Sequence, residues 1–242
     1  MTAIFQKELT AFFSSLIGYI AVAVFLILNG LIMWVFPNNA FDFGYANLDI
    51  LFTNAPLVFM LLIPAVTMRM FSEEKKSGTL EILVTRPVTE LQIILGKYAA
   101  ALLLVIISLL PTLLYFYTVF QFASPAGNVD TGAIAGSYIG LVLLSAVFVS
   151  MGLFASSLSS NQMVAFVLAA FFCFIFYITF TALSSLNLFG GRIDGIISQI
   201  GMQHHYESIS RGVVDSKDIV YFLSLIFIFL LSTKTALESR KW

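Results

Sequence analysis

Six long apolar stretches constrain the fold of this chain more than any other feature of its sequence. A bilayer core of about 30 Å needs about 20 apolar residues in a helix. Six segments come close to that length, so we expect an all-α polytopic membrane protein with six transmembrane helices. They run approximately over Leu16–Phe36, Ala55–Met70, Tyr98–Phe120, Ala135–Leu158, Met163–Leu183 and Ile219–Leu231. Pro64 and Pro111 lie inside the second and third segments, where we expect kinks.

The composition excludes a soluble globular fold. Of the 242 residues, 60% are hydrophobic and 10% are charged, whereas a soluble domain carries roughly 25% charged residues. The apolar segments leave no room for a separate soluble domain, so residues 1–242 are expected to form a single transmembrane domain. The first segment exceeds the length of a signal-peptide apolar region and no cleavage site follows it, which predicts a permanent helix.

The distribution of Lys and Arg predicts the orientation, because cytoplasmic connections carry the excess of these residues. With the N-terminus inside, nine basic residues are cytoplasmic and three are outside. The nine are Lys7, Arg69, Lys75, Lys76, Arg86, Lys97, Lys234, Arg240 and Lys241, and the three are Arg192, Arg211 and Lys217. Both termini are therefore expected in the cytoplasm.

Residues 1–15 predict an amphipathic helix that lies in the cytoplasmic membrane interface. Its apolar side is formed by Ile4, Phe5, Leu9, Phe12 and Phe13. Glu8 falls within this apolar stripe, so we expect a partner on a neighbouring element to neutralise it.

Three glycines spaced by four residues open the fourth apolar segment: Gly132, Gly136 and Gly140. Such spacing lets helix backbones approach closely. It fits either a dimer or moving interface, or ordinary tight packing within one subunit.

The only cysteine, Cys173, lies within an apolar segment and is expected to be a small buried hydrophobe.

Ionisable residues are missing from the middle of every apolar segment. Ion-coupled carriers need such groups within the membrane, so the energy source for any transport is expected outside this chain. An intramembrane protease is also disfavoured. Ser150, Ser156, Ser157 and Ser159 offer hydroxyl groups, but no intramembrane His or Lys could activate them.

The cytoplasmic connection 71–90 is patterned rather than a simple turn. Glu73–Lys76 form a charged patch, and Gly78 ends that helical turn. Thr79 can cap a second short helix, with Leu80, Leu83 and Val84 on its apolar face and Arg86 and Pro87 at its end. Thr89 and Gln92 have the spacing of a capping box that opens the next helix.

An apolar stripe between two defined stops favours a docking element for a cytoplasmic partner over a solvated connecting loop. The leucines would occupy a groove of the partner, and the charges would set the register.

Residues 74–87, with Gly78, Thr79, Leu80 and Glu81 at their core, resemble the signature loop of the ABC-2 type transporter permease family. The Gly96-Lys97 pair, the amphipathic helix over Phe5–Phe13 and six spans with both ends inside also match, so the resemblance covers essentially the whole chain. Residues 205–219 and 237–242 resemble more narrowly the permease subunit of the gliding-motility-associated ABC transporter of Bacteroidota.

This resemblance implies a permease subunit in a bacterial inner (plasma) membrane, with a homodimer or heterodimer of two permeases forming the pathway. A separate cytoplasmic ATPase would hold ATP and Mg; this chain has no phosphate-binding loop and is expected to hold no cofactor and to bind no nucleic acid. The implied ATPase-coupling residues are Glu73, Glu74, Gly78, Thr79, Leu80, Glu81, Leu83, Arg86 and Pro87. The direction implied by the family is export.

The connection 184–218 is expected to form an extracytoplasmic gate region. Its apolar set suits a surface or re-entrant helix pair that closes the outer mouth of the pathway, as in the family's outer gate. The predicted gate residues are Gly190, Gly191, Ile196, Ile197 and Ile200. A metal site at His204, His205 and Glu207 is the alternative, although adjacent histidines diverge by about 100° on a helix.

A membrane anchor or scaffold of a motility or secretion complex remains the second functional hypothesis. It would keep the docking connection but would need no pathway. The sequence does not define a substrate, and candidates range from a lipid-linked polymer to a peptide.

Overall fold

The computed structural model describes residues 1–37, 39–40, 42, 46–79, 88–125, 127–186, 191–212 and 214–239. These residues form helices and connections, without a strand among them. The α-helices are α1 (Thr2–Ser14), α2 (Leu16–Trp34), α3 (Asp49–Thr67), α4 (Arg69–Lys76), α6 (Glu90–Leu109), α7 (Leu113–Phe122), α8 (Thr131–Leu158), α9 (Gln162–Phe174), α10 (Phe180–Ser185), α11 (Gly191–Ile200), α12 (Met202–Ser210) and α13 (Ser216–Glu238). A 3-10 turn, η1 (Leu110–Thr112), joins α6 to α7, and a π-helical turn, η2 (Ile175–Thr179), joins α9 to α10.

Five helical segments of the described chain are long and apolar enough to cross a membrane. They are Asp49–Lys76, Glu90–Phe122, Thr131–Leu158, Gln162–Ser185 and Ser216–Glu238. A sixth crossing is obtained if α1 and the helix after it, bent by 66° to each other, count as one span. The prediction of an all-α polytopic membrane protein is confirmed. The second and sixth spans extend beyond their predicted apolar cores into flanking polar residues.

The two predicted proline kinks have different outcomes. Pro111 lies in η1, the 3-10 turn that interrupts the third span. Pro64 lies inside α3, and the break comes later, at Met68, between α3 and α4. Proline removes a hydrogen bond of the helix, but the interruption between α3 and α4 lies next to hydrogen bonds with Ser156 of α8.

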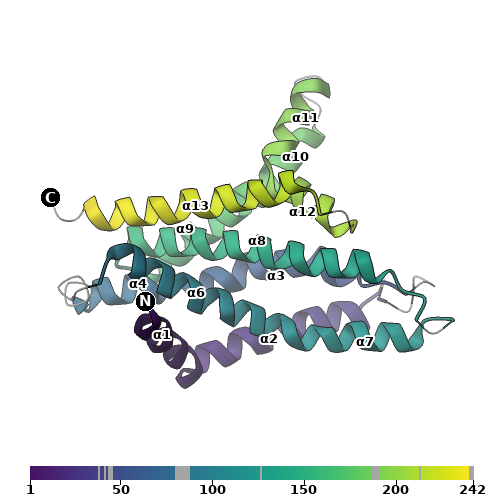
Figure 1. Cartoon of the computed structure of the whole chain (residues 1–242), viewed down its shortest axis with the longest axis horizontal. Coiled ribbons are helices and arrows are strands. Elements are labelled where there is room, and N and C mark those ends of the chain that lie inside the picture. Colours follow the sequence, from purple (N-terminus) through teal and green to yellow (C-terminus); the bar gives the residue numbers. More distant parts are fainter. Residues whose placement is uncertain are drawn as a thin grey trace.

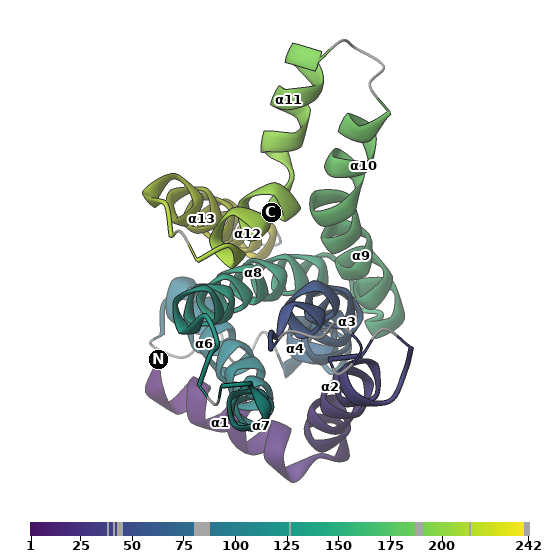
Figure 2. The ribbon, with the colours of Figure 1, turned by 90° about the vertical axis from the view of Figure 1, so that its right-hand side faces the viewer.

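Helix α8 occupies the centre of the bundle, between α3, α6, α9 and α13 (Figure 2). Its most apolar window is 78% buried, compared with 17% for α13. Hydroxyl groups inside the bundle bond mainly to their own helix: Ser145 donates to Val142 and Ser150 to Val147. These hydroxyl groups have hydrogen-bond partners within α8 itself, so they can be buried against the neighbouring helices.

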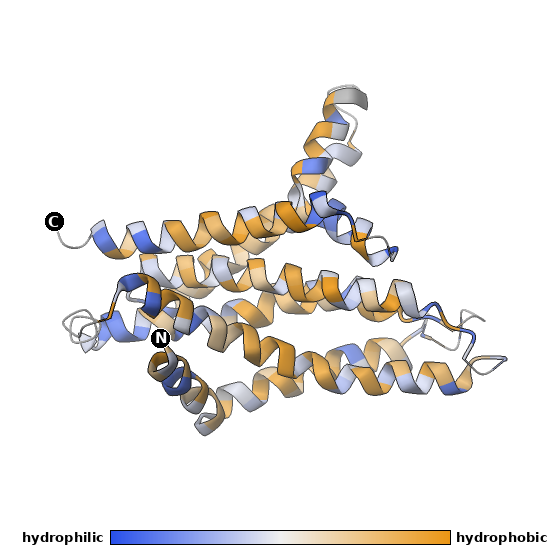
Figure 3. Ribbon diagram, in the orientation of Figure 1, coloured by the Kyte–Doolittle hydropathy of each residue, from blue (hydrophilic) through white to orange (hydrophobic). Residues whose placement is uncertain are grey.

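Both chain termini and α4 lie at one end of the bundle (Figure 1). Hydrophilic residues gather at this end and at the connections of the opposite end, whereas the helices between are mainly apolar (Figure 3). Helix α1 crosses this end from α6 to α2 (Figure 2). Ile4 and Phe12 of its apolar stripe are buried, but Phe13 is exposed, so the buried stripe is narrower than predicted.

The α10–α11 hairpin projects from the side of the bundle (Figures 1 and 2). Its base is η2, the π-helical turn through which α9 continues into α10. Helix α12 then runs back over α8, and α13 returns to the end that holds the termini.

Candidate functional site

The break between α3 and α4 is held by one hydroxyl of α8. The N–H groups in the first turn of a helix have no partner within the helix. Here the N–H groups of Phe71 and Ser72 donate to Ser156 Oγ at 3.0 and 3.1 Å, and that hydroxyl donates to the Met68 carbonyl at 2.8 Å. Ser156 therefore caps α4 from a different helix.

Two further contacts bind this break to α8. The ammonium of Lys75 donates to the Ser157 carbonyl. One turn earlier, Thr67 of α3 lies directly over Gly152 of α8. A Cβ at position 152 would lie 2.0 Å from Thr67 Oγ1, so only glycine allows this approach.

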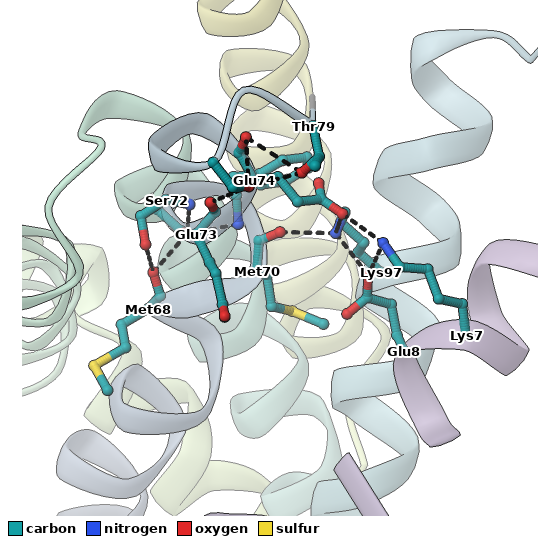
Figure 4. A network of polar contacts seen from close by, with 12 residues as sticks. Lys7, Glu8, Met68, Met70, Ser72, Glu73, Glu74, Thr79 and Lys97 are labelled. Carbon is teal, nitrogen blue, oxygen red and sulfur yellow. Dashed lines mark hydrogen bonds and ion pairs between the residues drawn. The ribbon is translucent and has the colours of Figure 1, made fainter. Parts of the chain in front are cut away.

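A buried cluster of charges joins α4 to α1 and α6 (Figure 4). Lys97 of α6 is 1% exposed, and its ammonium lies 2.7 Å from Glu8 Oε1 and 2.9 Å from Glu74 Oε1. It also donates to the Met70 carbonyl at 2.7 Å. Lys7 of α1 donates to Glu74 Oε1 at 2.8 Å. Two ammonium and two carboxylate groups therefore balance in charge, as burial requires.

The expected partner of Glu8 is thus Lys97, and the prediction of a neutralising neighbour is confirmed. Lys7 lies at the edge of the cluster, with about half of its side chain exposed. Burial lowers the pKa of Lys7, but the carboxylates of Glu74, Glu8 and Glu73 raise it by more, so it stays above its ordinary value. Lys7 therefore keeps its positive charge at neutral pH.

Arg69 completes the link between α4 and the start of α2. Its guanidinium donates to Ser15 Oγ at 3.1 Å and lies over the Phe12 ring, 5.2 Å from the centroid. Gly96, beside Lys97, packs on Ile4: a Cβ there would lie 3.1 Å from Ile4 Cγ2. Helix α4 is therefore attached to α1, α6 and α8 at once.

Of the predicted coupling residues that the structure describes, one is buried at α4 and others are exposed on the surface of the protein. Glu74 is buried in the charge cluster, whereas Glu73, Gly78 and Thr79 are exposed. Gly78 has φ +71° just after α4, so the predicted glycine stop is confirmed. The predicted capping box at Thr89 and Gln92 is also present. The remaining predicted coupling residues, Leu80, Glu81, Leu83, Arg86 and Pro87, lie outside the described residues.

Comparison with family models decides the class of protein. Residues 2–233 match the model of the ABC-2 family transporter proteins. The chain belongs to the ABC-2 transporter family. Members of this family are membrane subunits of transporters and are not themselves catalytic, and they normally work with a cytoplasmic ABC ATPase. None of the curated proteins compared with the chain matches it.

The glycine series of this ABC-2 protein packs largely within the subunit. A Cβ at Gly136 would lie 2.9 Å from the Ile209 carbonyl, and one at Gly140 would lie 3.3 Å from both Ile209 and the Tyr206 ring. Gly132 has only the nearby Asp130 carboxylate within 4 Å. Tight packing against α12 thus accounts for Gly136 and Gly140.

The predicted gate residues of the ABC-2 protein that the structure describes lie on α11 of the projecting hairpin. Ile196 and Ile200 are exposed on α11 and Ile197 is partly buried. Gly191 begins α11, and Gly190 lies outside the described residues. The hairpin is held internally by Ser184 Oγ, which donates to the Asp194 carbonyl at 2.8 Å.

The two adjacent histidines have separate environments. His205 Nδ1 lies 2.7 Å from Asp218 Oδ1 of α13, and Nε2 lies 2.8 Å from the Gln199 carbonyl. Its ring stacks on Tyr221 at 3.9 Å, whereas His204 is exposed. Both nitrogens of His205 are occupied, so this residue joins α11 and α12 to α13.

Lys97, Lys7 and Ser156 attach α4 to the bundle, and sequence reasoning did not assign them to this role. Glu8 lies in an apolar stripe, which implied an oppositely charged partner such as Lys97. The Gly96-Lys97 pair was noted only as part of the family resemblance. Ser156 was noted only as a hydroxyl without an activating base. Its role depends on the contact between α8 and α4, which are separated by more than 80 residues.

Proposed function

We propose that this chain is the permease subunit of an ATP-driven exporter in a bacterial inner membrane. In this proposal both termini and α4 face the cytoplasm, and a separate ATPase subunit binds and hydrolyses ATP with Mg. Membership of the ABC-2 family supports the proposal. The concentration of Lys and Arg at the end that holds the termini supports the orientation.

The attachment of α4 is the observation that carries the coupling proposal. Its inner side contacts α1, α6 and α8 through Glu74, Lys97 and Ser156. The segment that follows it is exposed at the same end of the bundle, at Gly78 and Thr79. An ATPase that pushes on this exposed segment would move three helices together, because hydrogen bonds and ion pairs join them to α4.

The assembly requires a second permease, which is either another copy of this chain or a different subunit. The resemblance at residues 205–219 and 237–242 favours a gliding-motility transporter of Bacteroidota. Identification of the proteins that copurify with the tagged chain tests both points. A copurifying ATPase supports the proposal, and a second permease-like protein supports a heterodimer.

Docking is tested by changing the exposed residues while keeping the buried ones. We expect Glu73→Arg combined with Gly78→Pro to abolish copurification of the ATPase, because proline cannot adopt the positive φ of residue 78. Glu238→Arg is the matched control, since the Glu238 side chain, at the end of α13, is 46% exposed. Undiminished copurification of the double variant would place the docking surface elsewhere.

The scaffold hypothesis predicts a different result in reconstituted vesicles. A transporter subunit must move some molecule across the membrane when its ATPase partner and ATP are present. A scaffold would bind the same partner without any nucleotide-dependent movement. Release of radiolabelled cell-extract components from loaded vesicles separates the two hypotheses.

A further inference from the structure

Two adjoining hollows lie on the side of the bundle formed by α3, α9 and α12. The first is a cavity of about 710 Å³ between α3, α8, η2 and α12, at the end of α3 remote from the termini. The second is a groove of about 470 Å³ between α3 and α9. Leu57 and Ile178 line both hollows, so the two form one continuous surface. Each volume lies within the range of ligand sites, about 300–1,000 Å³.

The cavity offers charges of both signs. Asp49 and Glu207 contribute carboxylates and Arg211 contributes a guanidinium. Asp49 accepts from Asn47, and Glu207 accepts from Gln203. The guanidinium of Arg211 forms no salt bridge or hydrogen bond with the described residues. A ligand in the cavity therefore meets a cation that lacks a protein partner and two carboxylates with remaining acceptor capacity.

Tyr177 is a second, independent sign of a ligand. It lies in the π-helical turn η2 and is 5% exposed. Its ring contacts Phe148 and Tyr206, but its hydroxyl forms no hydrogen bond with the described residues. The hydroxyl of Tyr206, by contrast, donates to the Phe52 carbonyl at 2.7 Å. Tyr177 thus supplies an unused donor at the cavity wall, and π-helical turns are frequent at functional sites.

The groove has the opposite chemistry. Besides Leu57 and Ile178, it is lined by apolar side chains such as Met60, Leu61, Val167 and Phe171. A small polar solute in the cavity would make no contact with this apolar groove. A molecule with a charged head and an apolar chain would occupy both hollows at once.

We propose that the cavity and groove form a binding site for a zwitterionic phospholipid of the phosphoethanolamine type. Its phosphate accepts hydrogen bonds from Arg211 and the Tyr177 hydroxyl. Its primary ammonium donates to Asp49 and Glu207, and an acyl chain lies in the groove between α3 and α9. Two carboxylates disfavour a lipid whose head carries only negative charge. A quaternary ammonium is also disfavoured because it has no N–H group to donate to them.

This inference names a substrate class for the proposed transporter and rests on the proposed function for any role in transport. Binding itself requires neither an ATPase nor a nucleotide. Failure of the chain to bind the lipid would contradict the lipid site but not the proposed function as an ATPase-driven permease. Lipid binding without a copurifying ATPase would instead count against the proposed function alone.

Native mass spectrometry of the purified chain with defined lipids tests the proposal. Phosphatidylethanolamine, phosphatidylcholine and phosphatidylglycerol with identical acyl chains are the probes. We expect the ethanolamine lipid to be retained about fivefold to tenfold better than the glycerol lipid, as one charge-assisted pair suggests. Glu207→Gln should remove most of this preference, because Glu207 accepts from the ammonium. Arg211→Gln should instead weaken retention of all three lipids, because all three carry the phosphate. Lys217→Gln, which changes a charge of α13 outside the cavity, should leave both the preference and the retention unchanged.

The groove has its own test. Ala170→Phe fills the groove and should weaken retention of the full lipid while leaving the melting temperature of the protein unchanged. Equal retention of the three lipids would overturn the proposal. Equally tight binding of glycerophosphoethanolamine, which has no acyl chain, would also overturn it. Full conversion of the Leu61→Cys variant to a disulfide-linked dimer in lipid would overturn it as well. A second copy of the chain, and not an acyl chain, would then cover the groove.

Discussion

Lys97 is a buried cation whose ammonium lies 2.7–2.9 Å from acceptors of α1 and α4. A buried charge is tolerated when paired and costly when its partner is removed. Glu8 could be recognised from the sequence as a charge in an apolar stripe, which implied a partner. The partner itself could not be named, because it lies 89 residues away and depends on how α1 crosses α6.

Replacing Lys97 should destabilise the protein strongly. Lys97→Met leaves the buried carboxylates of Glu8 and Glu74 facing each other, which should lower the free energy of unfolding by about 3 kcal/mol. Lys76→Met, at an exposed position of α4, is the control. Thermal unfolding in detergent measures both. Adding Glu8→Gln and Glu74→Gln to Lys97→Met should restore part of the loss. A triple variant less stable than the single one would contradict the cluster.

Gly152 and Gly132 of α8 should respond differently to the same substitution. Gly152→Ala brings a Cβ within 2.0 Å of Thr67 Oγ1, and we expect a loss of about 1–3 kcal/mol from overpacking. Gly132→Ala meets only Asp130 at 3.4 Å and should be close to neutral. Melting temperatures of the two variants in the same detergent provide the comparison. Equal losses would mean that α3 and α8 do not pack this closely.

At the scale of the elements, residues near a helix end predicted where the helix stops or starts. They predicted less well where a span is interrupted. The glycine stop after α4 and the capping box before α6 depend on nearby residues, so both could be predicted. The break at Met68 depends on Ser156 of α8. The π-helical turn η2 and helix α11 likewise pack on α12, which is remote from η2 in the sequence.

Removal of the Ser156 hydroxyl should loosen the first turn of α4. In Ser156→Ala the N–H groups of Phe71 and Ser72 lose their acceptor, at a cost of about 1–3 kcal/mol. Hydrogen exchange at these two amides should accelerate. Ser157→Ala is the matched control, because that hydroxyl donates only to Phe154 of its own helix. Unchanged exchange in Ser156→Ala would show that α4 is held by other contacts.

At the scale of the whole molecule, the number of apolar segments and the absence of charges inside them were enough to predict a polytopic helical fold. The lengths of the spans could not be predicted, because α3–α4 and α6–α7 continue into polar residues. The connection that includes the proposed docking residues was recognised by its sequence pattern. How α4 is joined to three other helices required the structure.

The orientation in the membrane can be tested with single cysteines. In a Cys173→Ala background, Asn128→Cys should react with a membrane-impermeant maleimide on intact spheroplasts, and Thr79→Cys should not. Asn128 and Thr79 are both exposed. Thr79 follows α4 and Asn128 lies in the connection from α7 to α8, at the opposite end of the bundle (Figure 1). Both should react after permeabilisation, which is the control for accessibility. The reverse pattern would place the termini and α4 outside.

The central claim is that α4 and its charge cluster transmit ATPase movement to the membrane helices. Spin labels at Asp42→Cys and Asn128→Cys, in a Cys173→Ala background, report the distance between two connections at the end remote from α4. With the copurified ATPase in vesicles, ATP and Mg should change this distance. Adding Lys97→Met, Glu8→Gln and Glu74→Gln should leave hydrolysis running but abolish the change. An equal change in distance with and without the cluster would contradict the account.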